Sequence, residues 1–130
     1  MTELLRIQNL TVDLPAGADR PHALKDLTLS VNAGEIVCVV GESGSGKSLT
    51  AGAILGLLPQ GVHASGGQIH WEGQDLLQLA PNALRRLRGR RIGMIFQEPM
   101  TALNPLRTIG DQIGEVFRTH TRLGLSLIHI

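Results

Sequence analysis

Residues 41–48 read Gly-Glu-Ser-Gly-Ser-Gly-Lys-Ser and match the pattern G-x-x-x-x-G-K-[ST] of phosphate-binding P-loops at every fixed position. Residues 36–40, directly before the loop, are Ile-Val-Cys-Val-Val, an apolar run typical of a buried parallel strand. Residues 47–58 carry apolar side chains at helical spacing, and Pro59 can end that helix. The sequence therefore predicts strand, glycine-rich loop and helix in succession, which is the setting that the motif needs.

The residue types of this loop suit phosphate binding. Glycine allows backbone conformations that a Cβ atom would block, so the N–H groups of the loop can turn inward and form a nest for anions. The helix N-terminus behind the loop adds unpaired N–H groups that favour phosphate oxygens. Lys47 supplies a mobile positive charge for the β- and γ-phosphates, and the Ser48 hydroxyl is suited to binding Mg²⁺. The predicted nucleotide-binding residues are Gly41, Glu42, Ser43, Gly44, Ser45, Gly46, Lys47, Ser48 and Leu49.

The alternative is a glycine-rich turn that only joins a strand to a helix. The Gly-Lys-Ser triplet at 46–48, placed after an apolar strand, favours the phosphate site over such a turn. In the phosphate site, Glu42, Ser43 and Ser45 contribute mainly their backbone N–H groups.

Composition bounds the class of protein without deciding its function. The 130 residues suffice for one modest domain, and with 42% hydrophobic but only 2% aromatic residues its core must be largely aliphatic. A formal net charge of +1 argues neither for nor against a polyanionic partner. The single cysteine, Cys38, is expected to be a small core residue of the strand over 36–40, which fits a reducing compartment.

No targeting or membrane-spanning signal is apparent. The N-terminal residues 1–6 lack the basic region and apolar stretch of a signal peptide. No apolar run approaches the length needed to span a bilayer. We therefore expect the chain to be soluble by itself and any membrane role to need a partner.

The remaining sequence alternates predicted strands with two predicted helices. Turn residues rich in Gly and Pro separate these elements. The expected strands, which alternate apolar and polar residues, are 4–14 (one or two strands), 27–31, 68–72 and 91–96, the loops are 15–21 and 61–67, and the helices are 82–87 and 109–118.

The order of these pieces resembles the ATP-binding subunit of an ABC transporter, over residues 4 to about 120. The P-loop together with residues 96–105, Phe-Gln-Glu-Pro-Met-Thr-Ala-Leu-Asn-Pro, resembles more narrowly the oligopeptide and dipeptide import branch. The resemblance implies an α/β P-loop NTPase fold with a RecA-like core and an N-terminal antiparallel β subdomain, truncated at the start of a helical subdomain near Pro99. It implies ATP and Mg²⁺ as cofactors.

The resemblance also implies roles and partners. In this family a glutamine at the end of this strand, the Q-loop, contacts Mg²⁺ and the attacking water, so Lys47 and Gln97 are the implied catalytic residues and Ser48 and Gln97 the implied metal ligands. From residue type and position at a strand end alone, the favoured interpretation of Gln97 is an ordinary polar residue that caps a strand. The implied partners are transmembrane permease subunits, a second ATP-binding subunit in a head-to-tail dimer and, indirectly, a solute-binding protein. The implied location is the cytoplasmic face of the inner (plasma) membrane.

The sequence departs from the family pattern near the expected adenine site. The family usually stacks adenine on an aromatic ring in the first strand region, whereas residues 11–14 offer none and Leu14 is the nearest substitute. His22 could stack there instead, or be a solvated loop histidine. Leu49 stands where many relatives carry threonine, so one hydroxyl is missing while its backbone donor stays.

The 130 residues also hold no LSGGQ signature, Walker B aspartate, catalytic glutamate or switch histidine. Hydrolysis in this family uses those groups with the P-loop, so we expect this chain alone to be inactive and the intact parent to be an ATPase driving uptake of peptides or a similar small solute. The alternatives are a soluble ABC ATPase without a transporter and a truncated, non-catalytic nucleotide-binding module.

The end of the chain is expected to be foreign to the domain. Residues 125–130, Leu-Ser-Leu-Ile-His-Ile, resemble a translated transposase adapter used in sequencing libraries, the alternative being a natural apolar tail. We therefore expect a domain over residues 1–124, the N-terminal part of an ABC transporter nucleotide-binding domain, and a non-native tail over 125–130.

Two further groups of residues are expected to carry no site. The arginines between 85 and 91 are predicted to form a solvated helix face rather than a nucleic-acid surface, because no stacking aromatics lie nearby. His63, His70 and His120 show no metal-ligand spacing with one another.

Overall fold

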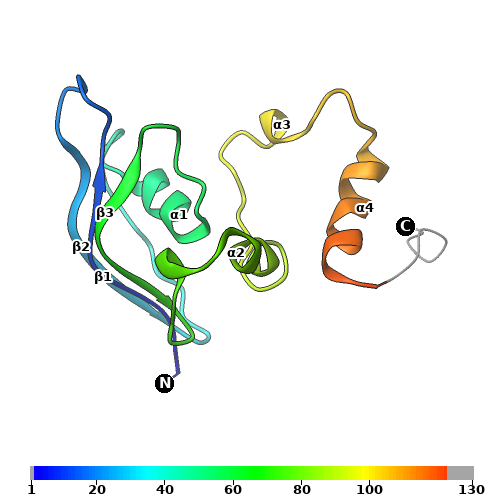
Figure 1. The fold of residues 1–130 in the computed structure, drawn as a ribbon, viewed down its shortest axis with the longest axis horizontal. Coiled ribbons are helices and arrows are strands. Elements are labelled where there is room, and N and C mark those ends of the chain that lie inside the picture. Colours follow the sequence, from blue (N-terminus) through cyan, green and yellow to red (C-terminus); the bar gives the residue numbers. More distant parts are fainter. Residues whose placement is uncertain (1, 123–130) are drawn as a thin grey trace. The chain divides into compact units, whose positions relative to one another are not determined.

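The structure, a computed structural model, describes residues 2–122 and divides into two compact units. The first unit is Met1–Ala80 and the second is Pro81–Ile130. Each unit has its own elements and is described by itself (Figure 1). The proposed tail at 125–130 lies outside the described residues.

The first unit is built on an antiparallel sheet with the order β2-β1-β3-β4. Its long strands are β1 (Glu3–Asp13), β2 (His22–Asn32) and β3 (His63–Trp71), and β4 (Gln74–Asp75) is a short edge strand. β1 lies in the middle and pairs with β2 on one side and β3 on the other (Figure 1). The antiparallel β region predicted at the N-terminus is therefore present, with β2 and β3 longer than the sequence pattern suggests.

The core of this unit is aliphatic, as the composition predicts. Ile7, Leu10 and Val12 of β1 and Ile69 of β3 are fully buried. Ile7 and Leu10 are three residues apart, which a regular strand would place on opposite faces. Asn9 lies between them with φ of 47°, and the pairing register shifts there, so a bulge returns Leu10 to the face of Ile7.

The bulge in β1 explains why β3 is longer than predicted. The Gly66-Gly67 pair was expected in a loop over 61–67, but it lies within β3 opposite β1. Gly67 has φ of +88°, and a Cβ atom there would lie 2.4 Å from the Asn9 carbonyl oxygen. The glycine thus permits a close approach of two strands instead of ending one of them.

Helix α1 (Lys47–Leu55) follows the P-loop and is shorter than the predicted 47–58. It ends because Gly56 adopts the left-handed conformation, with φ of 64°, and its N–H donates to the Ala53 carbonyl at 3.2 Å. Pro59 therefore plays no part in ending it. Ala53 and Leu55 are buried, and α1 lies beside the sheet (Figure 1).

The predicted buried strand over 36–40 is not formed. These residues have no strand assignment, Ile36 and Val40 are each 92% exposed, and Cys38 is exposed rather than in the core. A parallel strand requires neighbouring strands to satisfy its N–H and C=O groups, and nothing within residues 2–122 pairs with this run. The apolar sequence is suited to burial, but the described residues do not supply the partner.

The predicted strand over 91–96 is also wrong, for the same reason. It contributes one isolated parallel bridge, between Arg88 and Ile92, and Ile95 is 96% exposed. After β4, a 3-10 turn at Leu76–Gln78 was not predicted. Asp75 caps that turn, because its Oδ1 accepts a hydrogen bond from the Leu77 N–H at 3.0 Å.

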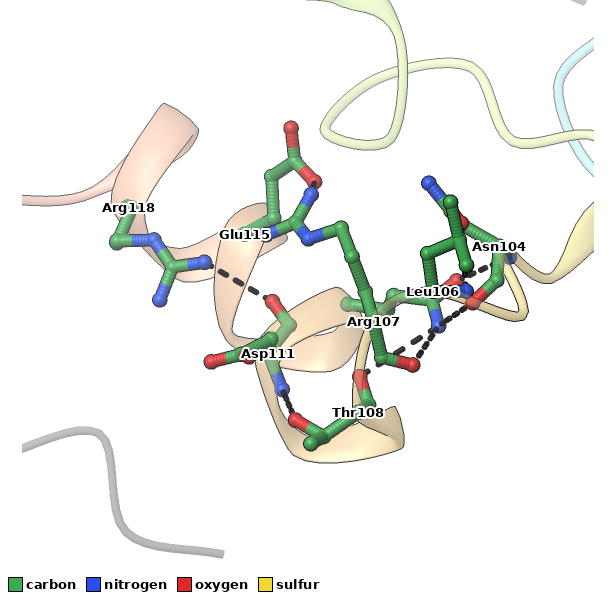
Figure 2. A network of polar contacts seen from close by, with 8 residues as sticks. Asn104, Leu106, Arg107, Thr108, Asp111, Glu115 and Arg118 are labelled. Atoms are coloured by element: carbon green, nitrogen blue, oxygen red, sulfur yellow. Dashed lines mark hydrogen bonds and ion pairs between the residues drawn. The ribbon is translucent and has the colours of Figure 1, made fainter.

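The second unit contains the two predicted helices and one short additional helix. They are α2 (Pro81–Leu87), α3 (Pro99–Ala102) and α4 (Ile109–His120). Thr108 caps α4, its hydroxyl oxygen accepting from the Asp111 N–H at 3.1 Å (Figure 2). No helix among residues 2–122 has both the length and the apolar character to cross a bilayer.

A polar network fixes the turn that leads into α4. The Gln112 side chain accepts from the Asn104 N–H at 2.8 Å and donates to the Asn104 carbonyl at 3.0 Å. Figure 2 shows Arg107 extending to Glu115, with 2.8 Å between Nη1 and Oε2. The segment 104–108 is therefore held against its own helix by side-chain amide and ionic bonds.

The contact between Gly67 and Asn9 yields a stability prediction. Gly67→Ala should lower the free energy of unfolding by more than about 2 kcal/mol, because the new Cβ meets a backbone oxygen in addition to the left-handed φ. Gly73→Ala is the matched control, with φ of +84° and no atom within 4 Å. It should lose only about 1 kcal/mol. The free energies of unfolding are measured by urea denaturation. Equal losses in the two variants would show that the close approach of β1 and β3 at Gly67 adds nothing to the cost of the substitution.

Candidate functional site

The P-loop forms a tight connection into α1. Gly44 and Gly46 adopt the left-handed conformation, with φ of 78° and 94°. A Cβ on Gly46 would lie 2.5 Å from Leu24 Cδ2 and 2.9 Å from the Ala23 carbonyl oxygen of β2. Only glycine allows both this conformation and this packing.

The start of α1 suits an anion. Gly46 is the residue before the helix, no side chain caps it, and the first turn contains no acidic residue. The backbone N–H groups there are thus free of side-chain acceptors, and the helix dipole favours negative charge. Thr50 anchors the turn from inside, because its buried hydroxyl donates to the Gly46 carbonyl at 2.9 Å.

The Lys47 ammonium is bound to its own loop. Its Nζ donates to the carbonyl oxygens of Gly41 and Glu42 at 2.7 and 2.6 Å and to Ser45 Oγ at 3.1 Å. These three bonds use all three donors of an ammonium group. A phosphate group that binds Lys47 must therefore replace at least one of them.

The other predicted loop residues lie at the surface. Glu42, Ser43 and Ser48 are exposed, and Leu49 is half-buried. The exposed Ser48 hydroxyl on the first turn of α1 is accessible to a cation. Among residues 2–122 no cluster of three or more His, Cys, Asp or Glu side chains has metal-binding geometry.

The loop over 15–21 reaches the P-loop. Arg20 Nη2 donates a hydrogen bond to the Gly44 carbonyl oxygen, 24 residues further along the chain. Residues 13–22 and His63 line an open hollow of about 530 Å³, with Arg20 among them. The sequence pattern did not single out Arg20, since no motif spacing links it to the P-loop.

Among the residues that line this hollow, the carboxylate of Asp13 joins the ends of three strands. Asp13 of β1 accepts a hydrogen bond from His22 Nδ1 of β2 at 2.6 Å, and its Oδ2 lies 3.8 Å from His63 Nε2 of β3. The hydrogen bond from His22, followed by one from Ser65, holds the pKa of Asp13 below its usual value. The His22 ring, one of two candidates for stacking adenine, is thus bound to Asp13 in this structure.

Gln97 lies in the second unit. It is exposed and sits in a bend just before α3, not at the end of a strand. The P-loop belongs to the first unit. The expected roles of Gln97 toward metal and water therefore stay predictions.

The family of the chain follows from comparison with known proteins. The family model described as "ABC transporter" matches residues 24–127, which include the P-loop and Gln97. The chain belongs to the ABC transporter family. The resemblance stated from the sequence is thereby confirmed.

The curated relatives carry names from the predicted branch. The chain is 52% identical over 120 residues to the probable D,D-dipeptide transport ATP-binding protein DdpD of Escherichia coli strain K12, covering 90% of the chain and 36% of that protein. It is 44% identical over 120 residues to the oligopeptide transport ATP-binding protein OppD of Mycobacterium bovis, covering 92% of the chain and 19% of that protein. The chain thus spans about a third or less of the length of these relatives.

A solved structure supports the fold class. The ADP conformation of an ATP-binding cassette of an ABC transporter superposes with a TM-score of 0.54 at 28% identity, covering 68% of the chain and 33% of that structure. The α/β P-loop fold with an N-terminal antiparallel β region is therefore confirmed.

The contacts of Asp13 with His22 and His63, which join the ends of β1, β2 and β3 and are called the clasp here, predict that stability depends on pH. A carboxyl group whose pKa is lowered by folding stabilises the folded state above its ordinary pKa of 3.8, and this is lost as pH falls through the lower folded-state value. Asp13→Asn should therefore lower the unfolding temperature at about pH 7, and the difference should shrink below about pH 3. Asp19→Asn, an exposed carboxylate of the adjacent loop, is the control. A difference that stays constant with pH would contradict the proposed clasp.

Proposed function

We propose that the chain binds ATP through the P-loop, as the nucleotide-binding part of an ABC ATPase. The observation that carries this proposal is the loop itself. Its glycines adopt left-handed conformations, a lysine ammonium lies inside it, and the uncapped start of α1 follows it. Phosphate oxygens are the ligands that this combination of donors favours.

Binding requires an exchange at Lys47. The ammonium leaves one or more of its bonds to Gly41, Glu42 and Ser45 and donates to the β- and γ-phosphates instead. The loop N–H groups and the first turn of α1 hold the remaining phosphate oxygens. The proposed binding set is Gly41, Glu42, Ser43, Gly44, Ser45, Gly46, Lys47, Ser48 and Leu49.

Mg²⁺ fits the exposed hydroxyl of Ser48, and Gln97 is the proposed second ligand. When bound, the ion neutralises charge on the phosphate oxygens and so favours transfer of the terminal phosphoryl group to water. Ser48 holds the cation beside the loop, while Lys47 orients the phosphates. Gln97 orients the attacking water.

For the intact protein we propose ATP hydrolysis coupled to import of peptides or a similar small solute. Support comes from the names of the relatives, which are peptide and dipeptide transport ATP-binding proteins. The proposed partners are transmembrane permease subunits, a second ATP-binding subunit in a head-to-tail dimer and, indirectly, a solute-binding protein. The proposed location is the cytoplasmic face of the inner membrane, through the permease subunits.

The second candidate is a nucleotide-binding module without hydrolysis. The sequence observation that favours it is that the 130 residues contain no LSGGQ signature and no Walker B aspartate. Under this proposal the chain alone binds nucleotide without turning it over. Measuring phosphate release by the full-length protein with its membrane subunits distinguishes the two candidates, because only the first predicts ATP turnover once the remaining family motifs are present.

The phosphate site is tested by Lys47→Ala. Removing the ammonium should weaken ATP binding about 10- to 100-fold, the equivalent of one or two charged hydrogen bonds. Titration of the chain with a fluorescent ATP analogue, followed by displacement with ATP, measures this. Lys25→Ala removes an exposed lysine of β2 and is the control. Undiminished affinity in Lys47→Ala would exclude the P-loop as the site.

The role of Gln97 is tested in the full-length protein with its membrane subunits. Gln97→Ala should leave ATP affinity within about twofold and lower kcat at least about tenfold, since the side chain is proposed to act on water and metal only during hydrolysis. ATP binding and phosphate release are measured on the same preparation. A variant with normal kcat would rule out the proposed role.

A further inference from the structure

We propose that Arg20 is a second cation of the phosphate site, which donates to a phosphate group of the bound nucleotide from the loop between β1 and β2. This inference rests on the proposed binding of nucleotide at the P-loop. It adds a residue that lies outside the P-loop motif.

The position of Arg20 is the first observation. Its guanidinium donates to the carbonyl oxygen of Gly44, so the charge lies at the P-loop in the same compact unit. The loop that carries Arg20 is closed at its base, where the Leu14 N–H donates to the Pro21 carbonyl at 2.9 Å. Inside the loop, the Ala18 N–H donates to the Pro15 carbonyl at 3.2 Å. These bonds hold Arg20 near the P-loop before any ligand binds, which reduces the entropy lost on binding.

The spare hydrogen-bonding capacity of Arg20 is the second observation. A guanidinium has five N–H donors, and this side chain is exposed with one hydrogen bond, to Gly44. Within the described part of the chain no carboxylate forms an ion pair with it. Planar forked donors of this kind match phosphate oxygens.

Lys47 provides the contrast. Its three donors are all bound to Gly41, Glu42 and Ser45, so it must give up a bond to receive a phosphate. Arg20 can donate to a phosphate while keeping its bond to Gly44. Of these two cations, Arg20 is therefore the one that can bind a phosphate without breaking an existing hydrogen bond.

Charge balance is the third observation. The two loops, residues 15–21 and 41–48, contain two carboxylates, Asp19 and Glu42, and two cations, Arg20 and Lys47. Their formal charge is zero, and without Arg20 it would be −1. A polyphosphate approaching a locally negative pair of loops would be repelled, and Arg20 removes that net negative charge.

A simpler role for Arg20 must be separated from this one. The Gly44–Ser45 peptide is held on both sides, by Arg20 at its carbonyl and by the Glu42 carbonyl, which accepts from the Ser45 N–H at 3.2 Å. Arg20 could thus act only by fixing the loop. Arg20→Gln distinguishes the roles, because glutamine can donate to Gly44 but carries no charge.

The test measures displacement of a fluorescent ATP analogue from this chain by ATP and by inorganic tripolyphosphate. Arg20→Ala should weaken both competitors by about tenfold at low salt. Arg20→Gln should lose as much affinity for both competitors as Arg20→Ala does. Arg20→Lys should retain part of the wild-type affinity, because it keeps a positive charge. The loss should shrink between about 0.05 and about 0.5 M salt, because exposed charges are screened. Lys25→Ala is the charge-matched control.

Several results would overturn the proposal. Wild-type affinity in Arg20→Gln would show that Arg20 only positions the loop. A loss confined to ATP, with tripolyphosphate unaffected, would place Arg20 on the nucleoside. Normal binding by Arg20→Ala, with binding lost in Lys47→Ala, would refute this inference and leave the proposed function standing. Normal binding by Lys47→Ala would refute both.

Discussion

The contact between Gly46 and β2 is the constraint on which the candidate site depends. The absence of a side chain lets the loop pass so close to β2 that a Cβ atom on Gly46 would overlap the Ala23 carbonyl oxygen and the Leu24 side chain. This approach fixes where α1 begins relative to the sheet, and the buried Thr50 hydroxyl secures the same turn. The position of the anion-favouring helix start is therefore set by packing against the sheet.

The sheet in turn brings the β1–β2 loop to the P-loop. The bulge at Asn9 keeps Ile7 and Leu10 on the buried face of β1. At those ends Asp13 joins β1 to β2 through His22. Loop closure between Leu14 and Pro21 follows immediately, and Arg20 projects from that closed loop to Gly44. Successive contacts along β1 and the loop after it thus connect the core of the sheet to the proposed phosphate site.

Structural features that depend on residues close together in the sequence could be predicted. The P-loop, α1, α2, α4 and the antiparallel strands follow from glycine positions and from periodicity. The strands at 36–40 and 91–96 failed because apolar residues show a preference for burial but do not supply a pairing partner. Arg20 and Asp13 were missed because their contacts join residues that are distant in sequence and follow no fixed spacing.

The absence of an aromatic ring near Leu14 gives the phosphate contacts more weight. Stacking on an aromatic ring contributes about 0.5–1.5 kcal/mol beyond burial, and an aliphatic side chain cannot replace it. If nucleotide binds at the P-loop as proposed, its recognition depends more on the proposed contacts of Lys47, Arg20 and the backbone donors, all of which act on charge. Such a site distinguishes ligands mainly by their number of phosphates and only weakly by their base. Its affinity should also fall with ionic strength more steeply than that of a site with a stacked adenine.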